Sequence, residues 1–121
     1  MGQDGTLAGL RPGGIVVDMT TSSPKLAVRI AEAAALEGIS SIDAPVTGGD
    51  VGAKNGTLSI MLGGNEATAE TLTPLLLETI AGSVTHFGEA GSGQQAKLAN
   101  QIGIATQIIA MAESMVFAHS A

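Results

Sequence analysis

The chain has 121 residues, enough for one modest domain with a hydrophobic core. Its net charge is −6, and only 2% of its residues are aromatic, with no Trp or Tyr, so we expect no nucleic-acid partner. The absence of Cys excludes disulfides, zinc thiolate sites and thiol catalysis. His86 and His119 are far apart and lack metal-ligand spacing, so we expect structural or incidental histidines and no metal.

The first half of the chain has a strand–helix–strand pattern. Residues 14–18, GIVVD, form a β-branched run that predicts a buried strand. A helix follows, capped by Ser22 or Ser23 and ended by Gly38, and residues 39–43, ISSID, return to strand. This order within about thirty residues is typical of the βαβ unit of a parallel sheet.

The second half alternates in a similar way up to a glycine-rich link. The expected elements are a strand over residues 56–64, a helix capped by Asn65 over residues 66–72, a strand over 83–87, a link over 88–93 and a helix from Gln94 onward. We expect Pro74 to break the helix after Asn65 or to start a second helical turn.

The last helix is apolar on nearly every side. Such a helix needs to be buried on nearly every side, and nothing else in the sequence is able to surround it. Either a second subunit covers it, or part of the protein is missing from this chain. Gln107, Glu113 and scattered small polar residues argue against a membrane-spanning helix. We therefore expect a soluble cytoplasmic protein without a membrane partner.

Residues 43–52, DAPVTGGDVG, combine features that a plain turn does not need. Pro45 fixes one φ angle, and Gly48 and Gly49 open conformations that other residues avoid. Thr47 places a hydroxyl beside two amides that carry no side chains, which suits a small pocket for an anionic group. The alternative is a tight connection between two strands.

Phosphate-loop signals are lacking. GEAGSGQQAK, residues 88–97, has Gln-Gln where a Walker loop needs Lys-Ser or Lys-Thr, and no G-x-G-x-x-G stands between a strand and a helix. The acids Asp18, Asp43 and Asp50 lie in separate segments, and we interpret them as strand-end or turn residues.

One lysine stands out in the C-terminal half. Lys97, Asn100 and Gln101 are spaced to share one helix face. A lysine on a mostly apolar helix must extend to solvent, pair with an acid or have its pKa lowered, and a lysine with a lowered pKa can exchange a proton with a substrate oxygen. The alternative is an ordinary solvated lysine near a helix start.

Three ordered motifs together resemble the β-hydroxyacid dehydrogenases, which include 3-hydroxyisobutyrate dehydrogenase and tartronate semialdehyde reductase (2-hydroxy-3-oxopropionate reductase). The motifs are VVDMTTSSP, residues 16–24; DAPVTGGDVGAKNGTLSIMLGG, residues 43–64; and GSGQQAKLANQ, residues 91–101. The related 6-phosphogluconate dehydrogenase is less similar, because its Pro-Ser pair after the glycines and its histidine after the lysine are not seen here.

The resemblance implies an NAD- or NADP-dependent oxidoreductase that interconverts a small 3-hydroxy acid and its semialdehyde. The implied roles are substrate carboxylate binding by Thr47, Gly48 and Gly49, proton transfer by Lys97, substrate orientation by Asn100 and Gln101, and contact with the nicotinamide end of the cofactor by Thr21.

The resemblance also implies an α/β fold in two parts. Residues 1–87 correspond to the second part of a Rossmann-type dinucleotide-binding domain, without its G-x-G-x-x-G half, and residues 88–121 to the start of an interdomain helix and a truncated helical domain. We expect an internal fragment with little activity alone, and a homo-oligomer formed through the long helix. The alternative functions are a non-catalytic small-carboxylate-binding module and an assembly module.

Overall fold

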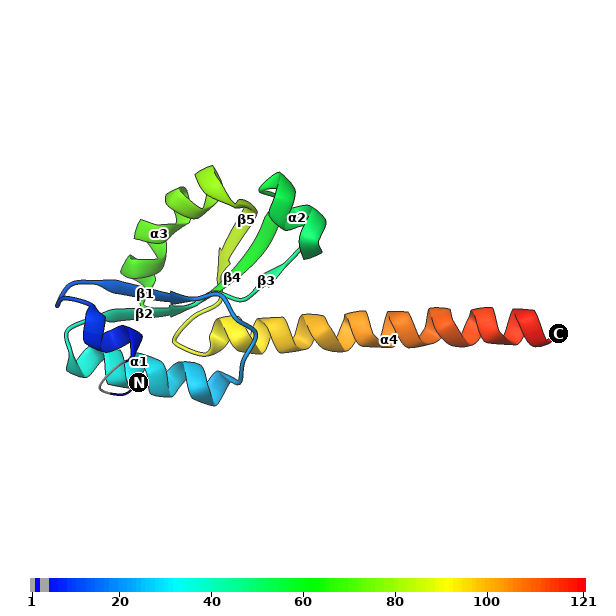
Figure 1. Cartoon of the computed structure of the whole chain (residues 1–121), viewed down its shortest axis with the longest axis horizontal. Helices are drawn as coiled ribbons and strands as arrows, with labels where there is room; N and C mark the ends of the chain where they lie inside the picture. The colour runs from blue at the N-terminus through cyan, green and yellow to red at the C-terminus, as the bar shows by residue number, and fades with distance from the viewer. Residues whose placement is uncertain (1, 3–4) are drawn as a thin grey trace.

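The computed structural model describes residue 2 and residues 5–121. A mixed sheet carries helices on both faces, and a long C-terminal helix extends away from it (Figure 1). In chain order the elements are η1 (Thr6–Gly9), β1 (Ile15–Asp18), α1 (Pro24–Leu36), β2 (Ser40–Asp43), β3 (Val46–Thr47), α2 (Gly49–Asn55), β4 (Leu58–Gly64), α3 (Glu66–Thr79), β5 (Ala81–His86) and α4 (Ser92–Ser120).

The strand pairing confirms the predicted βαβ unit and adds antiparallel strands to it. β1 and β2 pair in parallel through the α1 crossover, as the sequence pattern indicates. β4 lies antiparallel to both β2 and β3 along one edge and parallel to β5 along the other. The predicted α/β class with parallel strands is therefore confirmed, within a sheet that is mixed.

β2 and β3 act as one strand along β4. Ile42 pairs with Gly64, and Thr47 pairs with Ser59, in a register that continues across the Ala44–Pro45 interruption. Pro45 has no N–H to donate, but its carbonyl accepts a hydrogen bond from Met61 N at 3.0 Å, which keeps the two strands together. The DAPVT segment is thus held against β4 along its whole length.

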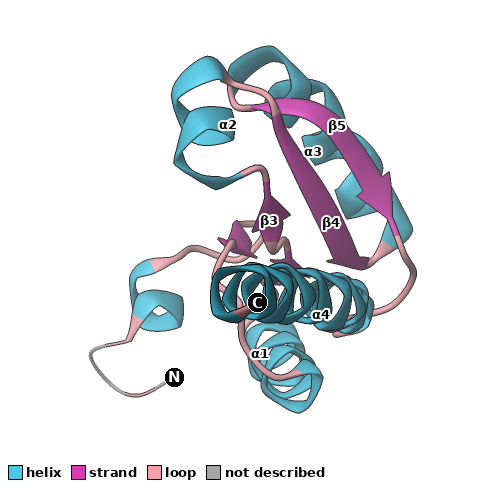
Figure 2. Cartoon of the chain, turned by 90° about the vertical axis from the view of Figure 1, so that its right-hand side faces the viewer, coloured by secondary structure: helices cyan, strands magenta, loops and turns pink. Residues whose placement is uncertain are grey.

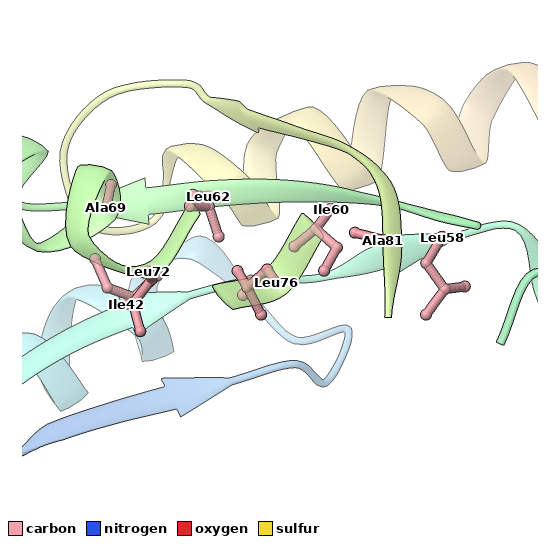
Figure 3. Close-up of a cluster of buried hydrophobic side chains, with 9 residues drawn as sticks. Ile42, Leu58, Ile60, Leu62, Ala69, Leu72, Leu76 and Ala81 are labelled. Atoms are coloured by element: carbon pink, nitrogen blue, oxygen red, sulfur yellow. The ribbon is translucent and has the colours of Figure 1, made fainter. Parts of the chain in front are cut away.

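The hydrophobic core lies between the sheet and α3 (Figure 3). Alternate residues of β4 point into it, as expected for a strand with one buried face. α1 covers the opposite face of the sheet together with the first turns of α4 (Figure 1). The core cluster consists of Ile42, Ala44, Leu58, Ile60, Leu62, Ala69, Leu72, Leu76 and Ala81.

Two helices differ from the sequence expectation. α3 continues through Pro74 to Thr79, so the predicted break at Pro74 is wrong. Leu72 and Leu76 are buried on either side of the proline, and their burial holds both halves of α3 against the same face of the sheet. α2, over Gly49–Asn55, was not predicted, because its glycine-rich sequence has the composition of a turn.

The predicted caps and the structural histidine are found in place. Ser23 caps α1 by accepting from Leu26 N, and Asn65 caps α3 by accepting from Thr68 N. The His86 ring lies 2.8 Å from the Gly64 carbonyl oxygen, so it links β5 to the end of β4. His119 is exposed in the last turn of α4.

α4 leaves the body of the molecule after its first two turns (Figure 1). Its later apolar side chains, among them Ile102, Ile109 and Phe117, are exposed. By length and composition α4 could cross a membrane, a test that core helices of soluble proteins also pass. The predicted apolar helix therefore exists, and its far turns have no cover among the described residues.

Candidate active site

The start of α4 is attached to the end of β2 by a buried carboxylate. Gly91 occupies the N-cap position and has no side chain to cap the helix. The Asp43 carboxylate takes that role: Oδ1 accepts from Gly91 N at 2.7 Å and Oδ2 accepts from Gln94 N at 2.9 Å. Negative charge at this end of a helix is also favoured by the helix dipole. Asp43 is therefore the capping group of α4, beyond its expected role as a strand-end residue.

The side chain of Gln94 attaches α4 to the loop after β1. Its Oε1 accepts a hydrogen bond from Ser22 N at 2.9 Å, and its Nε2 donates to the Thr20 carbonyl at 2.8 Å. Thr21 lies between these two anchored residues and is exposed. Thr20 is further held by Asp18, which accepts from its N–H and its hydroxyl. The loop that presents Thr21 is thus fixed on both sides.

The residues predicted to form an anion pocket lie where β3 leads into α2. Thr47 pairs with Ser59 of β4 and is half-buried. Gly48 has φ +131° and Gly49 has φ +63°, values that L side chains rarely adopt, so glycine is required to turn the chain into α2. Neither glycine N–H donates a hydrogen bond within the described part of the chain. A Cβ on Gly49 would meet nothing within 4 Å, so open space adjoins this backbone.

Lys97 is buried on α4, one turn after Gln94. It is 7% exposed, and its ammonium makes no hydrogen bond or ion pair within the described part of the chain. Asn100 is half-buried, and its Oδ1 is enclosed without a hydrogen-bond partner among the described residues. Gln101 is exposed. The three residues share a helix face as predicted, with the lysine innermost.

The structure brings the predicted residues to one region through their elements. α4 packs on β4 and β2, and β3 pairs with β4, so Lys97 and Thr47 are held by the same strand. β3 lies beside the first turns of α4 in both views (Figures 1 and 2). Thr21 is joined to α4 through Gln94, as described above. Gln101 is exposed, as are Thr21, Gly48 and Gly49.

Three residues of this region were not predicted. Asp43 and Gln94 have no motif spacing, because their partners are backbone groups far along the chain. Ser22 was expected only as a possible cap of α1, yet its hydroxyl is enclosed and lacks a hydrogen-bond partner among the described residues. The enclosed oxygens of Ser22 and Asn100 mark polar positions that a ligand can satisfy.

Comparison with known protein families identifies the fold. Residues 1–88 match the family described as the NAD binding domain of 6-phosphogluconate dehydrogenase. The chain belongs to this family. The Rossmann-like nature of the fold is thereby established, and with it the predicted relation to NAD-dependent oxidoreductases.

Curated relatives carry the names expected from the motifs. The chain is 53% identical over 119 residues to a probable 3-hydroxyisobutyrate dehydrogenase-like protein, mitochondrial, of Arabidopsis thaliana, covering 98% of this chain and 35% of that protein. It is 42% identical over 120 residues to the 2-hydroxy-3-oxopropionate reductase of Escherichia coli, covering 99% of this chain and 41% of that protein. The chain therefore spans between about one third and two fifths of the length of these relatives.

Solved structures share the fold. The Mycobacterium tuberculosis 3-hydroxyisobutyrate dehydrogenase with L-serine superposes with a TM-score of 0.84 at 41% identity, over 94% of this chain and 39% of that one. Psf3 in complex with NADP+ and 2-OPP superposes with a TM-score of 0.79 at 33% identity, over 93% of this chain and 42% of that one. The similarity extends over both the sheet and α4.

Proposed function

We propose that this chain contributes the substrate and proton-transfer part of an oxidoreductase that moves a hydride between NAD(P) and a small 3-hydroxy acid or its semialdehyde. The observation that carries the proposal is the buried Lys97, placed on a helix whose start is hydrogen-bonded to the loop carrying Thr21 and to the strand leading to Thr47. The names of the relatives fit the same reaction class.

The proposed roles are those that the family resemblance implies, and the surroundings of each group support them. Thr47 Oγ1 and the unpaired amides of Gly48 and Gly49 bind the substrate carboxylate. Lys97 lies on the neighbouring helix and donates a proton to the carbonyl oxygen in reduction, and removes it in oxidation. Asn100 uses its unpartnered amide oxygen to orient the substrate, with Gln101 at the outer end of the same face. L-serine in the mycobacterial structure is itself a small 3-hydroxy acid.

The residues after β1 fit the nicotinamide end of a dinucleotide. Thr21 is exposed at a fixed loop, and the enclosed Ser22 hydroxyl lacks a partner among the described residues. NAD or NADP, when bound, supplies or accepts the hydride. We propose that residues 1–87 belong to the second part of the dinucleotide-binding domain and residues 88–121 to the start of a helical domain, so that substrate and cofactor meet between them.

We propose a second copy of the protein as the partner of α4. Large apolar side chains are exposed around α4, which would favour association in water; they include Ile102, Ile108, Ile109, Met115 and Phe117. A soluble, cytoplasmic location fits the net charge of −6. Light scattering of the chain with Ile109→Asp, compared with the unaltered chain, tests the association: the substitution should shift the population to the monomer, and an unchanged oligomer would contradict the proposal.

A graft tests the proposed reaction directly. Residues 1–121 replace the aligned segment of the Escherichia coli reductase, and oxidation of NADH and NADPH is followed with 2-hydroxy-3-oxopropionate as substrate. We expect turnover, with a preference for carboxylate-bearing aldehydes over aldehydes of similar size without a carboxylate. A folded graft that turns over no small semialdehyde would overturn the proposal.

A binding measurement separates the alternative functions. The 121-residue chain is titrated with tartronate and 3-hydroxyisobutyrate by calorimetry without nucleotide. We expect weak binding, because the substrate site of an oxidoreductase is completed by the cofactor. Tight cofactor-free binding would favour a non-catalytic carboxylate-binding module instead.

A further inference from the structure

The carboxylate of Asp43 is enclosed in a space that only glycines can provide. Asp43 is 3% exposed. A Cβ on Gly63 of β4 would lie 2.6 Å from Asp43 Oδ1, and a Cβ on Gly93 of α4 would lie 2.8 Å from Asp43 Oδ2. Two elements thus approach the carboxylate more closely than any side chain would allow. An acid and two glycines therefore lie where β2, β4 and α4 meet.

Close backbone contact at this junction leaves α4 little freedom to shift. A Cβ on Gly93 would overlap the Met61 carbonyl oxygen of β4, and a Cβ on Gly63 would lie 2.6 Å from Gly93 N. The first turn of α4 therefore lies directly on the β4 backbone. With Asp43 bonded to Gly91 N and Gln94 N, the axial position of α4 is fixed by both packing and hydrogen bonds.

Gln94 extends this junction to the loop after β1. Its side chain is 0% exposed, and both of its polar atoms are used, one for Ser22 N and one for the Thr20 carbonyl. These bonds join residues 72 and 74 positions apart. The loop after β1 is therefore hydrogen-bonded directly to the helix that carries Lys97.

We infer that Asp43 and Gln94 are positioning residues, which hold Lys97 and Thr21 at a fixed separation for coupled proton and hydride transfer. The inference rests on the proposed function. Asp43 sets where α4 begins, and thereby where Lys97 lies. Gln94 sets where the Thr21 loop lies relative to the same helix. A misplacement of about 1 Å can cost roughly 100-fold in rate, so such a junction matters for catalysis.

The kinetic test uses neighbouring glutamines in the graft. Gln94→Ala removes both side-chain bonds, whereas Gln95→Ala removes an exposed side chain next to it. The assays are run well below the melting temperature of each variant. We expect kcat to fall about 10- to 100-fold for Gln94→Ala and less than about twofold for Gln95→Ala. A Gln94→Ala variant that melts earlier but keeps its kcat has lost stability only, and would overturn the inference.

A double variant shows whether the residues act through Lys97. In the Lys97→Met background, Asp43→Asn and Gln94→Ala should each lower the residual kcat by less than about twofold. Both residues are inferred to hold the Thr21 loop at a fixed separation from the Lys97 ammonium, which is already absent in this background. If either substitution lowers kcat by the same factor with and without Lys97→Met, the inference is overturned. If Lys97→Met itself leaves kcat unchanged, the proposed function fails instead, which distinguishes the two.

Hydrogen exchange gives a readout without activity. In the 121-residue chain, Gln94→Ala should speed exchange of the Ser22 amide at least about tenfold, and Gln95→Ala should not. Asp43→Asn retains the size of the side chain but replaces one acceptor with a donor, so the amides of Gly91 and Gln94 should exchange faster. Unchanged exchange at Ser22 in Gln94→Ala would contradict the inferred link.

Discussion

The Asp43 carboxylate accepts a hydrogen bond from the backbone N–H of Gln94 at 2.9 Å, across 51 positions of sequence. This bond joins the end of β2 to the first turn of α4. The strand that leads into the proposed carboxylate pocket and the helix that bears Lys97 therefore form one unit. The relative position of the two proposed functional groups is therefore set by the buried Asp43 side chain, which bonds to the backbone of α4.

Lys97 is predicted to carry proton transfer. Lys97→Met keeps the apolar stem in its buried position and removes the ammonium group. In the graft we expect kcat to fall by about 10²- to 10⁴-fold, the usual range for loss of a general acid. Steady-state assays with 2-hydroxy-3-oxopropionate measure the effect.

Lys25 provides the control for this substitution. It is an exposed lysine in the first turn of α1, and Lys25→Met should change kcat by less than about twofold. Equal losses from Lys25→Met and Lys97→Met would show that charge alone, rather than placement, determines the rate.

Thr47 is predicted to bind the substrate carboxylate. Thr47→Val preserves the β-branched shape in β3 and removes only the hydroxyl. We expect KM for 2-hydroxy-3-oxopropionate to rise roughly tenfold, equivalent to about 1.4 kcal/mol, through loss of one charge-assisted hydrogen bond. Thr85→Val, at an exposed position of β5, is the matched control. Equal KM values for the two variants would place the carboxylate elsewhere.

Gly93 is predicted to be intolerant of any side chain. Its Cβ would overlap the Met61 carbonyl and lie 2.9 Å from the Asp43 carbonyl. We expect Gly93→Ala to lower the free energy of unfolding by about 1–3 kcal/mol, as over-packed positions do. Urea unfolding of the 121-residue chain, followed by circular dichroism, measures this change.

Gly103 is the matched control on the same helix. A Cβ there would meet nothing within 4 Å, so Gly103→Ala should stabilise the helix by about 0.5–1 kcal/mol. The two Gly→Ala substitutions should therefore have opposite signs. Equal effects would mean that α4 does not pack on β4 in solution as the structure shows.

Pro74 is predicted to weaken α3. It lies inside the helix at an exposed position and cannot donate a backbone hydrogen bond. Pro74→Ala should raise the free energy of unfolding by about 1–3 kcal/mol, because alanine restores that bond and fits the helix better. Thermal unfolding measures the change, and a lower melting temperature would argue that the proline itself is needed for packing.

Leu62 is predicted to be a main contributor to stability. It is 0% exposed in the core between β4 and α3, so Leu62→Ala should cost about 2–5 kcal/mol. Leu36→Ala removes the same atoms at a position that is 87% exposed, and should change stability by less than about 0.5 kcal/mol. Similar costs for the two substitutions would contradict the described core.

The elements that could be predicted from the sequence are those whose signals are local. The β-branched run before Asp18, the capping residues Ser23 and Asn65, and the spacing of Lys97 and Asn100 all depend on neighbours within one helical turn or one strand. Local sequence also predicted the wrong outcome at Pro74, since tertiary burial of Leu72 and Leu76 outweighed the local cost of proline. Helix α2 was also not predicted, because its glycine-rich sequence has the composition of a turn.

The contacts that hold the predicted site residues could not be predicted from the sequence. Asp43 and Gln94 bind backbone groups that any residue could supply, so no spacing rule reveals those bonds from the sequence. Likewise, the need for glycine at position 93 comes from a β4 carbonyl more than thirty residues away. Pairing of distant backbone groups depends on how sheet and helix pack, and that is why the junction became visible only in three dimensions.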